Sequence, residues 1–309
     1  MRAVNLVTAS LVQSAESVTL LPMTELAQQT EHLDDALPLG PQSLVWKYFG
    51  DNRMYLIGPR PAVLQNMLAE LGQGVYDHST FFADTAERLK RTIPPIFNTV
   101  YGSDENNAGL QVRDFHHHVK GEMPGTDGAR YHALDPETYF WAHATFVEQI
   151  YYFADTFVKR LTDAEREQIW LESKTWYRRY GVSDRPMPAT YAEFEQYWDR
   201  MMDQVVVAHP SAKYGVGYVT KGFPKPKAVH PLVWRLVAPV FNPLAAFLTT
   251  GGLPPRARML LGLPWTDKQE RRYQRFAAIW RSRPVNWIWD RLPMRVRYSG
   301  YAVKGYARN

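Results

Sequence analysis

The chain has 309 residues, 45% of them hydrophobic and 14% aromatic, enough to bury a full core in one large domain or two tightly packed ones. It contains no cysteine, which excludes disulfides, thiolate metal sites, iron–sulfur clusters and cysteine nucleophiles. The net charge of +5 is uneven, because the segment from Arg256 to the end carries +10 and the preceding residues carry −5.

This basic C-terminal segment also contains three tryptophans, Trp280, Trp287 and Trp289. Such a segment could make a peripheral membrane contact with anionic lipid, or it could bind nucleic acid. A solvated helix face with an Arg-rich terminus is the favoured interpretation. No nucleic-acid-binding motif occurs, so we expect no nucleic-acid partner.

Helical periodicity dominates the chain, and alternating strand patterns are rare. Residues 1–44 are polar and poorly patterned, and we expect an N-terminal arm there. Glycines and prolines then punctuate the pattern and set the ends of the expected helices. The expected helices cover residues 61–71, stopped by Gly72 and Gly74; 84–94, ended by Pro94-Pro95; a short one over 97–101; and 113–120, stopped by Gly121.

The second half begins with a loop over residues 122–130, expected from its Gly, Pro and Asp content. A long helix from Pro136 to about Arg160 follows, and further helices are expected over 162–180, 190–207, 229–250 and 254–282. Residues 209–227 are rich in Gly, Pro and Lys, and we expect a flexible connection that could act as a lid. The sequence therefore predicts an all-α protein: one large domain with about ten or more helices.

Two features bear on localisation. The first residues lack the continuous apolar core of a signal peptide. The segment from Leu232 to Leu253 is apolar, but Arg235, prolines and Gly251-Gly252 interrupt it, so we interpret it as a buried or interfacial helix pair rather than a membrane crossing. The expected location is cytoplasmic, with membrane association left open.

His143 lies in the middle of the most clearly marked helix, which Asp135 can cap and in which Pro136 suits the first turn. It is three residues after Phe140 and four before Val147, so it falls on the apolar, core-facing stripe. A buried imidazole there can be hydrogen-bonded, or it can ligate a metal or a haem iron. Periodicity alone favours the hydrogen-bonded core histidine.

Three consecutive histidines, His116, His117 and His118, form a second candidate site. Successive helical residues point about 100° apart, so these three cannot grip one ion. A single structural histidine, or one that contacts a haem propionate, is favoured over a metal triad. The sequence leaves open which of the three faces inward.

Arg88, Arg91 and Thr92 form the third candidate, because offsets of three and four place them on one helical face. Two guanidinium groups and a hydroxyl aimed inward would suit a carboxylate, a propionate or an anionic intermediate. A surface basic helix is an equal alternative. No Walker loop, dinucleotide-binding fingerprint, zincin motif or nucleophile elbow occurs.

These residues stand within an ordered series of short signatures spread along the chain. The series is Gln65, Gly74-Val-Tyr-Asp-His78-Ser79, Arg88-x-x-Arg91-Thr92, His116-x-x-Val119-x-Gly121, Tyr131-x-Ala133-x-Asp135-Pro136, Trp141-x-His143-Ala-Thr145, Leu161-Thr-x-x-Glu165-Arg166 and Leu253-Pro-x-x-x-Arg258. In order and spacing it resembles the catalytic domain shared by ER-bound MpaB-type oxygenases and the bacterial rubber oxygenases (latex-clearing proteins). The resemblance covers residues 45–300 and leaves 301–309 as a C-terminal tail.

The resemblance implies a globin-like helical core and a b-type haem whose iron is held by one proximal histidine, which by the match is His143. Its other ring nitrogen should donate to a second acceptor. The distal side would carry Arg88, Arg91 and Thr92 as catalytic residues, with His116 near the cofactor. Rubber oxygenases have lysine where this chain has Arg91, and arginine cannot ligate iron, so the iron should be five-coordinate or hold water.

The resemblance therefore predicts a haem-dependent oxygenase with dioxygen and a small apolar substrate, isoprenoid or lipid-like, as its reactants. Because this chain has Arg91 where the rubber oxygenases have lysine, the resemblance is weaker evidence that rubber itself is the substrate. A non-catalytic helical protein that binds haem or lipid is the alternative.

Overall fold

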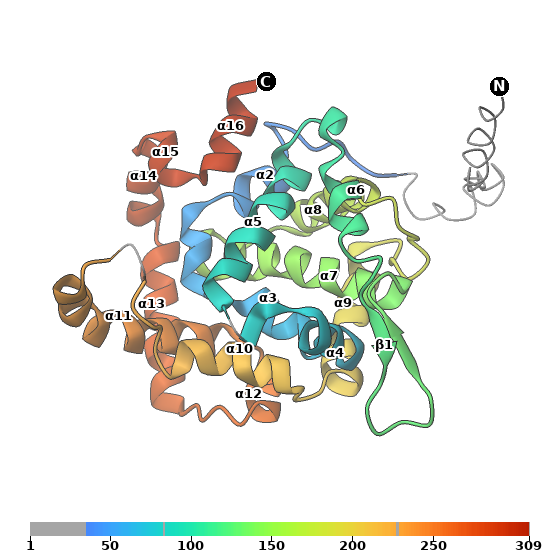
Figure 1. Ribbon diagram of the computed structural model, residues 1–309. Coiled ribbons are helices and arrows are strands. Elements are labelled where there is room, and N and C mark those ends of the chain that lie inside the picture. The colour runs from blue at the N-terminus through green and yellow to red at the C-terminus, as the bar shows by residue number, and fades with distance from the viewer. Residues whose placement is uncertain (1–34, 83, 227–228, 309) are drawn as a thin grey trace, which may run out of the picture.

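The computed structural model describes residues 35–82, 84–226 and 229–308, so most of the expected N-terminal arm lies outside the described residues. The protein is all-α, as predicted, with more than ten helices and one small two-stranded ribbon in the described part. Figure 1 shows α7 in the middle of the molecule with the other helices arranged around it. Their bounds are α2 Leu44–Phe49, α3 Arg60–Gln65, α4 Ala69–His78, α5 Thr85–Tyr101, α6 Ala108–Asp114, α7 Pro136–Phe153, α8 Asp163–Arg178, α9 Tyr191–Arg200, α10 Pro210–Thr220, α11 Pro231–Gly252, α12 Pro255–Leu260, α13 Asp267–Arg281, α14 Arg283–Arg291, α15 Met294–Arg297 and α16 Gly300–Arg308.

The central helix α7 begins as the sequence predicts. The Asp135 carboxylate accepts hydrogen bonds from the backbone N–H groups of Glu137 and Thr138, and Pro136 takes the first turn. At its other end the helix widens into a π-helical turn over Ala154–Val158. The Asp155 carboxylate there receives the Leu161 backbone N–H at 2.8 Å and pairs with Arg166 at 2.5 Å, which fixes the start of α8. Both ends of α7 are therefore fixed by specific contacts.

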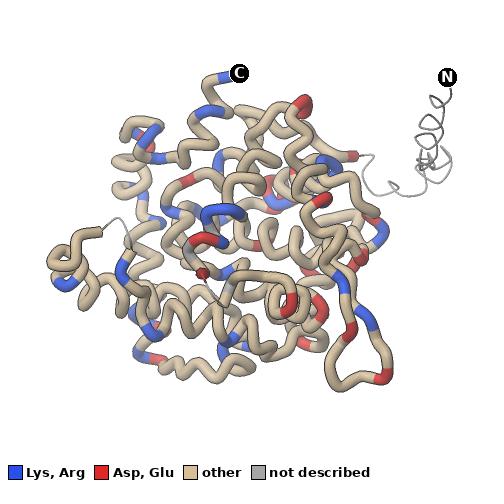
Figure 2. The backbone as a smooth tube through the Cα atoms, viewed as in Figure 1, with Lys and Arg blue, Asp and Glu red and all other residues tan. Residues whose placement is uncertain are grey.

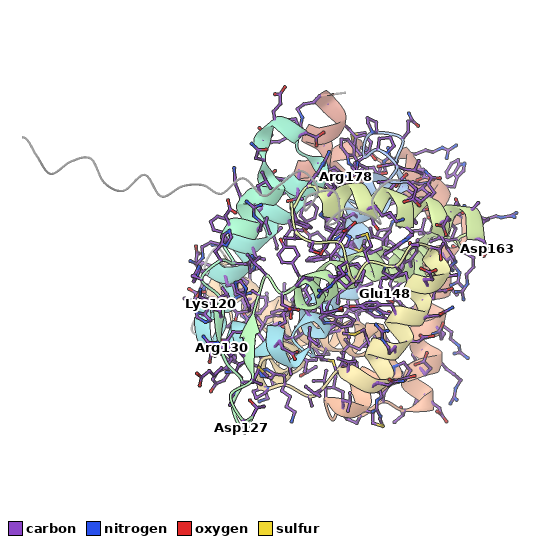
Figure 3. All side chains as sticks on the ribbon, turned by 90° about the vertical axis from the view of Figure 1, so that its right-hand side faces the viewer. Lys120, Asp127, Arg130, Glu148, Asp163 and Arg178 are labelled. Atoms are coloured by element: carbon purple, nitrogen blue, oxygen red, sulfur yellow. The ribbon has the colours of Figure 1, made fainter. Side chains whose placement is uncertain are left out.

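The core surrounds α7, which packs against α2, α3 and α8. In Figure 3, Asp163 and Arg178 mark the two ends of α8, which runs alongside the helix that carries Glu148. Glu148 makes an ion pair with Arg60 of α3, which is buried and also donates to the Gly252 carbonyl at 2.7 Å. One buried guanidinium thus ties together α3, α7 and the end of α11.

Several expected helix boundaries were wrong in the first half. The helix expected over 61–71 is interrupted after Gln65, and Gly72 and Gly74 lie inside α4 instead of ending a helix. Gly72 is needed there because a Cβ would overlap the His209 ring. Helix α5 continues through Pro94 and Pro95 to Tyr101. Proline has no N–H, so the carbonyls four residues before each proline lose their helical hydrogen bond, but those residues are exposed and water can solvate the carbonyls.

The region after α6 also differs from the prediction. Helix α6 ends at Asp114, and strands β1 Lys120–Glu122 and β2 Arg130–His132 pair antiparallel, with the expected loop 122–130 as their connection. Figure 3 shows Lys120 and Arg130 on this hairpin and Asp127 near its tip. Each of these strands has only three residues, too few for an alternating pattern to be recognised in the sequence.

The last third contains the largest differences. Residues 210–220 form the regular helix α10, which Pro210 begins rather than breaks, so the expected flexible connection is limited to the residues that follow. Helix α11 is one continuous helix and not a pair, and most of it is exposed rather than buried. The last residues form α16, which packs along α5 with Gly305 against Tyr101.

Candidate functional site

His143 projects from the middle of α7 into the core, and only 2% of its surface is exposed. Neither ring nitrogen has a hydrogen-bond partner among the residues that the structure describes. The backbone of Ser173 on α8 lies close enough to influence the ring, but no hydrogen bond is completed. A buried imidazole normally satisfies both nitrogens, so this arrangement leaves a donor and a lone pair for something else.

Aromatic rings from α7 and α8 enclose His143. Trp176 lies edge-on to the imidazole with 5.0 Å between centroids, Tyr177 is also at 5.0 Å and Tyr180 at 6.2 Å. Trp176 donates its indole N–H to the Tyr180 hydroxyl at 2.8 Å, which fixes two of these rings relative to each other. The sequence analysis missed these residues, although the spacing Trp176-Tyr177-x-x-Tyr180 on a predicted helix could have indicated one aromatic face.

Burial lowers the pKa of His143 to about 3, although the nearby Ser173 backbone acts in the opposite direction. The ring is therefore neutral at physiological pH. A neutral imidazole with a free nitrogen is the state in which histidine ligates a metal.

Tyr139, one turn before His143 on the same face of α7, connects the imidazole to a second histidine. Its ring lies 5.4 Å from Tyr180 and 6.2 Å from His116. The Tyr139 hydroxyl is buried and has no hydrogen-bond partner in the described part of the chain, and burial raises its pKa well above the usual value. An unpaired phenol thus lies near His116 and, through Tyr180, near His143.

Of the three consecutive histidines, His116 faces inward. Its Nδ1 atom lies 2.7 Å from the Val112 carbonyl, and burial lowers its pKa below the usual value, assisted by the charge of Arg88. His117 is exposed and lies 3.3 Å from Asp114, while the ring of His118 lies 6.1 Å from that of His78. Among the described residues no group of three or more His, Asp or Glu could hold a metal ion.

The three residues expected on the distal side lie on the first half of α5. Arg88 is mostly buried, bonds to the Ser79 hydroxyl, and is near enough to His116 for their charges to interact. Arg91 is exposed and donates to the Thr80 hydroxyl at 2.7 Å, and the Thr92 hydroxyl donates to the Arg88 carbonyl at 2.9 Å. The structure therefore places Arg88 within electrostatic range of His116, whereas Arg91 lies at the surface.

A cavity of about 740 Å³ lies at the opposite end of α7, beside its π-helical turn. It is lined by charged side chains that already pair with partners in the protein, including Arg166 with Asp155. We do not assign it to the chemistry, because His143 does not line it.

Comparison with known proteins places this arrangement in a family. The model of the "ER-bound oxygenase mpaB/B'/Rubber oxygenase, catalytic domain" family matches residues 46–282, a span that contains α7, α5 and both inward-facing histidines. The chain belongs to this family. The family is that of an oxygenase catalytic domain, which indicates an oxidoreductase.

Two curated relatives are similar to the chain. They are uncharacterised proteins of Mycobacterium bovis and Mycobacterium tuberculosis, each 23% identical over 226 residues, which is 71% of this chain and 84% of the relative. No solved structure matches the chain.

Proposed function

We propose that the protein is a haem b-dependent oxygenase in which His143 is the proximal iron ligand. The observation that carries the proposal is the buried, neutral imidazole of His143 with both nitrogens unpaired. A histidine in that state fits axial ligation of a haem iron, which requires one side chain and not a cluster. Haem, when bound, would supply the binding and activation of dioxygen.

The residues around His143 would hold the ring in one orientation. Trp176 and Tyr177 pack against it from α8, and the Ser173 backbone, which influences the ring, would accept from the nitrogen that does not ligate iron. Such a second contact fixes the tautomer and strengthens the ligand. Together these rings also exclude water from the proximal side.

Arg88 would provide positive charge on the distal side. It is mostly buried, remains charged although burial lowers its pKa, and is anchored by the Ser79 hydroxyl. A fixed cation in a poorly solvated place stabilises developing negative charge, or pairs with a propionate. Thr92 can still accept a hydrogen bond, and Arg91 would hold the turn at Thr80 that precedes α5. His116 would lie near the edge of the cofactor.

The substrate would be small and apolar, isoprenoid or lipid-like, with dioxygen as the co-reactant. The aromatic rings of Tyr139, Tyr177 and Tyr180 near His143 support this class, since they make its surroundings largely apolar. The family description includes ER-bound members, which favours a protein that acts close to a membrane.

The test compares haem content and visible spectra of the wild type, His143→Ala and His117→Ala, all expressed with a haem precursor. We expect a Soret band in the wild type and in His117→Ala, a control at an exposed histidine, and its loss or shift in His143→Ala. Equal haem content and equal spectra in all three proteins would remove His143 from the site, and absence of haem from the wild type would refute haem dependence.

A non-catalytic haem- or lipid-binding role is the alternative function. The unpaired Tyr139 hydroxyl argues for it equally well, since a buried donor could bind a ligand without turnover. Oxygen uptake by the reduced protein with an isoprenoid substrate distinguishes the two, because only the oxygenase consumes dioxygen in proportion to product.

A further inference from the structure

Helix α11 carries a continuous apolar face that the rest of the molecule does not cover. Side chains repeat along it at intervals of four residues, which places them in two adjacent rows on one side of the helix. Their exposed fractions are 64% for Leu232, 79% for Leu236, 71% for Val240 and 44% for Leu244 in one row, and 50% for Val233, 46% for Val237 and 44% for Phe241 in the other. An exposed patch of this kind normally binds something.

The helix projects from the body of the molecule. Figure 1 shows its first part standing out on the left-hand side, beyond α13 and α10. Helix α10 packs along it, and the Asn242 side chain accepts the Phe223 backbone N–H at 3.3 Å, so the projecting part is held in a defined position. The apolar face of α11 is therefore part of an ordered surface and not of a frayed helix end.

The other end of α11 is anchored in the core. Residues 248–252 are buried, Arg60 donates to the Gly252 carbonyl, and a Cβ at Gly251 would overlap the Tyr273 ring. By length and composition, α11 is the one helix in the described part that could cross a membrane. With its last residues buried, however, only about 17 residues or about 25 Å remain free, less than the ~30 Å of a bilayer's hydrocarbon core.

The charge around this face has one sign. No Asp or Glu occurs between Asp203 and Asp267, a stretch that contains all of α10, α11 and α12. The same stretch contains seven basic residues, Lys213, Lys221, Lys225, Lys227, Arg235, Arg256 and Arg258. Figure 2 shows blue and no red on the projecting part of α11.

We propose that the apolar face of α11 docks onto an anionic lipid bilayer, with the helix lying in the plane of the headgroup region. Apolar side chains that enter the interface, flanked by cations that meet lipid phosphates, are the pattern of a monotopic amphipathic helix. Trp234, half-buried beside Phe241, suits the same depth. The membrane contact would therefore be made by α11 and not by the tryptophans of the basic C-terminal segment.

Charge favours lipid over a second copy of the chain as the occupant. A symmetric dimer through α11 would bring two acid-free, basic surfaces together, and like charges at close range oppose association. An anionic bilayer neutralises the same cations. The inference does not depend on haem, because it rests on exposure, anchoring and charge alone.

The test measures flotation of the full-length protein with vesicles of phosphatidylcholine alone and with 30% phosphatidylglycerol. We expect binding to the anionic vesicles, and at least a tenfold weaker partition for the variant Leu232→Ser/Leu236→Ser/Val240→Ser. The matched control is Met259→Ser/Ile279→Ser, which removes exposed apolar side chains from α12 and α13 and should bind as the wild type does. Circular dichroism checks that all variants fold.

A second set replaces the charges alone, with Lys221→Gln, Lys225→Gln and Arg235→Gln combined. This variant should lose the preference for anionic vesicles and most of the salt dependence of binding. The proposal is overturned if wild type and the triple serine variant bind equally, or if the wild type ignores anionic vesicles. It is also overturned if the serine changes instead abolish a concentration-dependent dimer seen by light scattering.

Discussion

Replacing Arg60 by methionine tests how the core is held around the helix that carries His143. The guanidinium is almost fully buried, with 2% of the side chain exposed, and pairs with Glu148, of which 15% is exposed. It also donates to the Gly252 carbonyl at 2.7 Å and lies 4.4 Å from the centroid of the Tyr152 ring. Methionine keeps the volume of the stem but removes every polar contact.

The expected loss in the free energy of unfolding for Arg60→Met is about 3–5 kcal/mol, because Glu148 is left as an unpaired, mostly buried carboxylate. Most of this loss comes from the stranded charge, so Arg60→Met/Glu148→Leu should be more stable than Arg60→Met. Urea unfolding followed by circular dichroism at neutral pH measures all the variants, Glu148→Leu included. A single-variant loss below about 1 kcal/mol, or a double variant as unstable as the sum of the single changes, would refute the reasoning.

Three further predictions concern the surroundings of the site. In the apo protein the His143 pKa of about 3 lies below the unfolded value, so its contribution to stability is present above about pH 6.5 and is lost as pH falls toward 3. Between pH 7.5 and 5, the wild type should therefore lose about 2 kcal/mol more unfolding free energy than His143→Leu does. Urea titrations at the two pH values measure this difference, and equal losses would contradict the lowered pKa. Gly109→Ala should destabilise by about 2–3 kcal/mol, because a Cβ would overlap the Arg179 carbonyl oxygen, and thermal unfolding that matches the wild type would show that α6 can move away. Asp135→Ala removes the α7 cap and should cost about 1 kcal/mol in the same assay without changing the Soret position, whereas a shifted band would mean that the cap also places His143.

Where capping and periodicity agree, the sequence was sufficient to predict the fold. The Asp135 cap forms as expected, and α7 and α8 start where the sequence predicts, α8 with a capping box of Thr162 and Glu165 that only the structure reveals. Prolines and glycines misled the prediction where their role depends on neighbours. Pro210 begins a helix because the first turn suits proline, and Gly72 lies inside one, where it packs against the His209 ring of another segment.

For the candidate site, periodicity correctly placed His143 in the core but favoured a hydrogen-bonded imidazole. The structure instead leaves both nitrogens unpaired, a property that depends on every neighbouring side chain and cannot be read from spacing. The same limit applies to α5, where helical offsets group Arg88 with Arg91. Both bond to hydroxyl groups of the chain before α5, yet one is mostly buried and the other exposed, a difference that spacing does not encode. The haem itself stays a prediction.

The fixing of α7 at both ends has a consequence for how this oxygenase can change. Asp135 at one end and the π-helical turn with Asp155 at the other hold the backbone of the central helix in register. The β1–β2 hairpin is far less enclosed. Mutations should therefore be tolerated on this outer segment, while the backbone that carries the His143 ring stays in place.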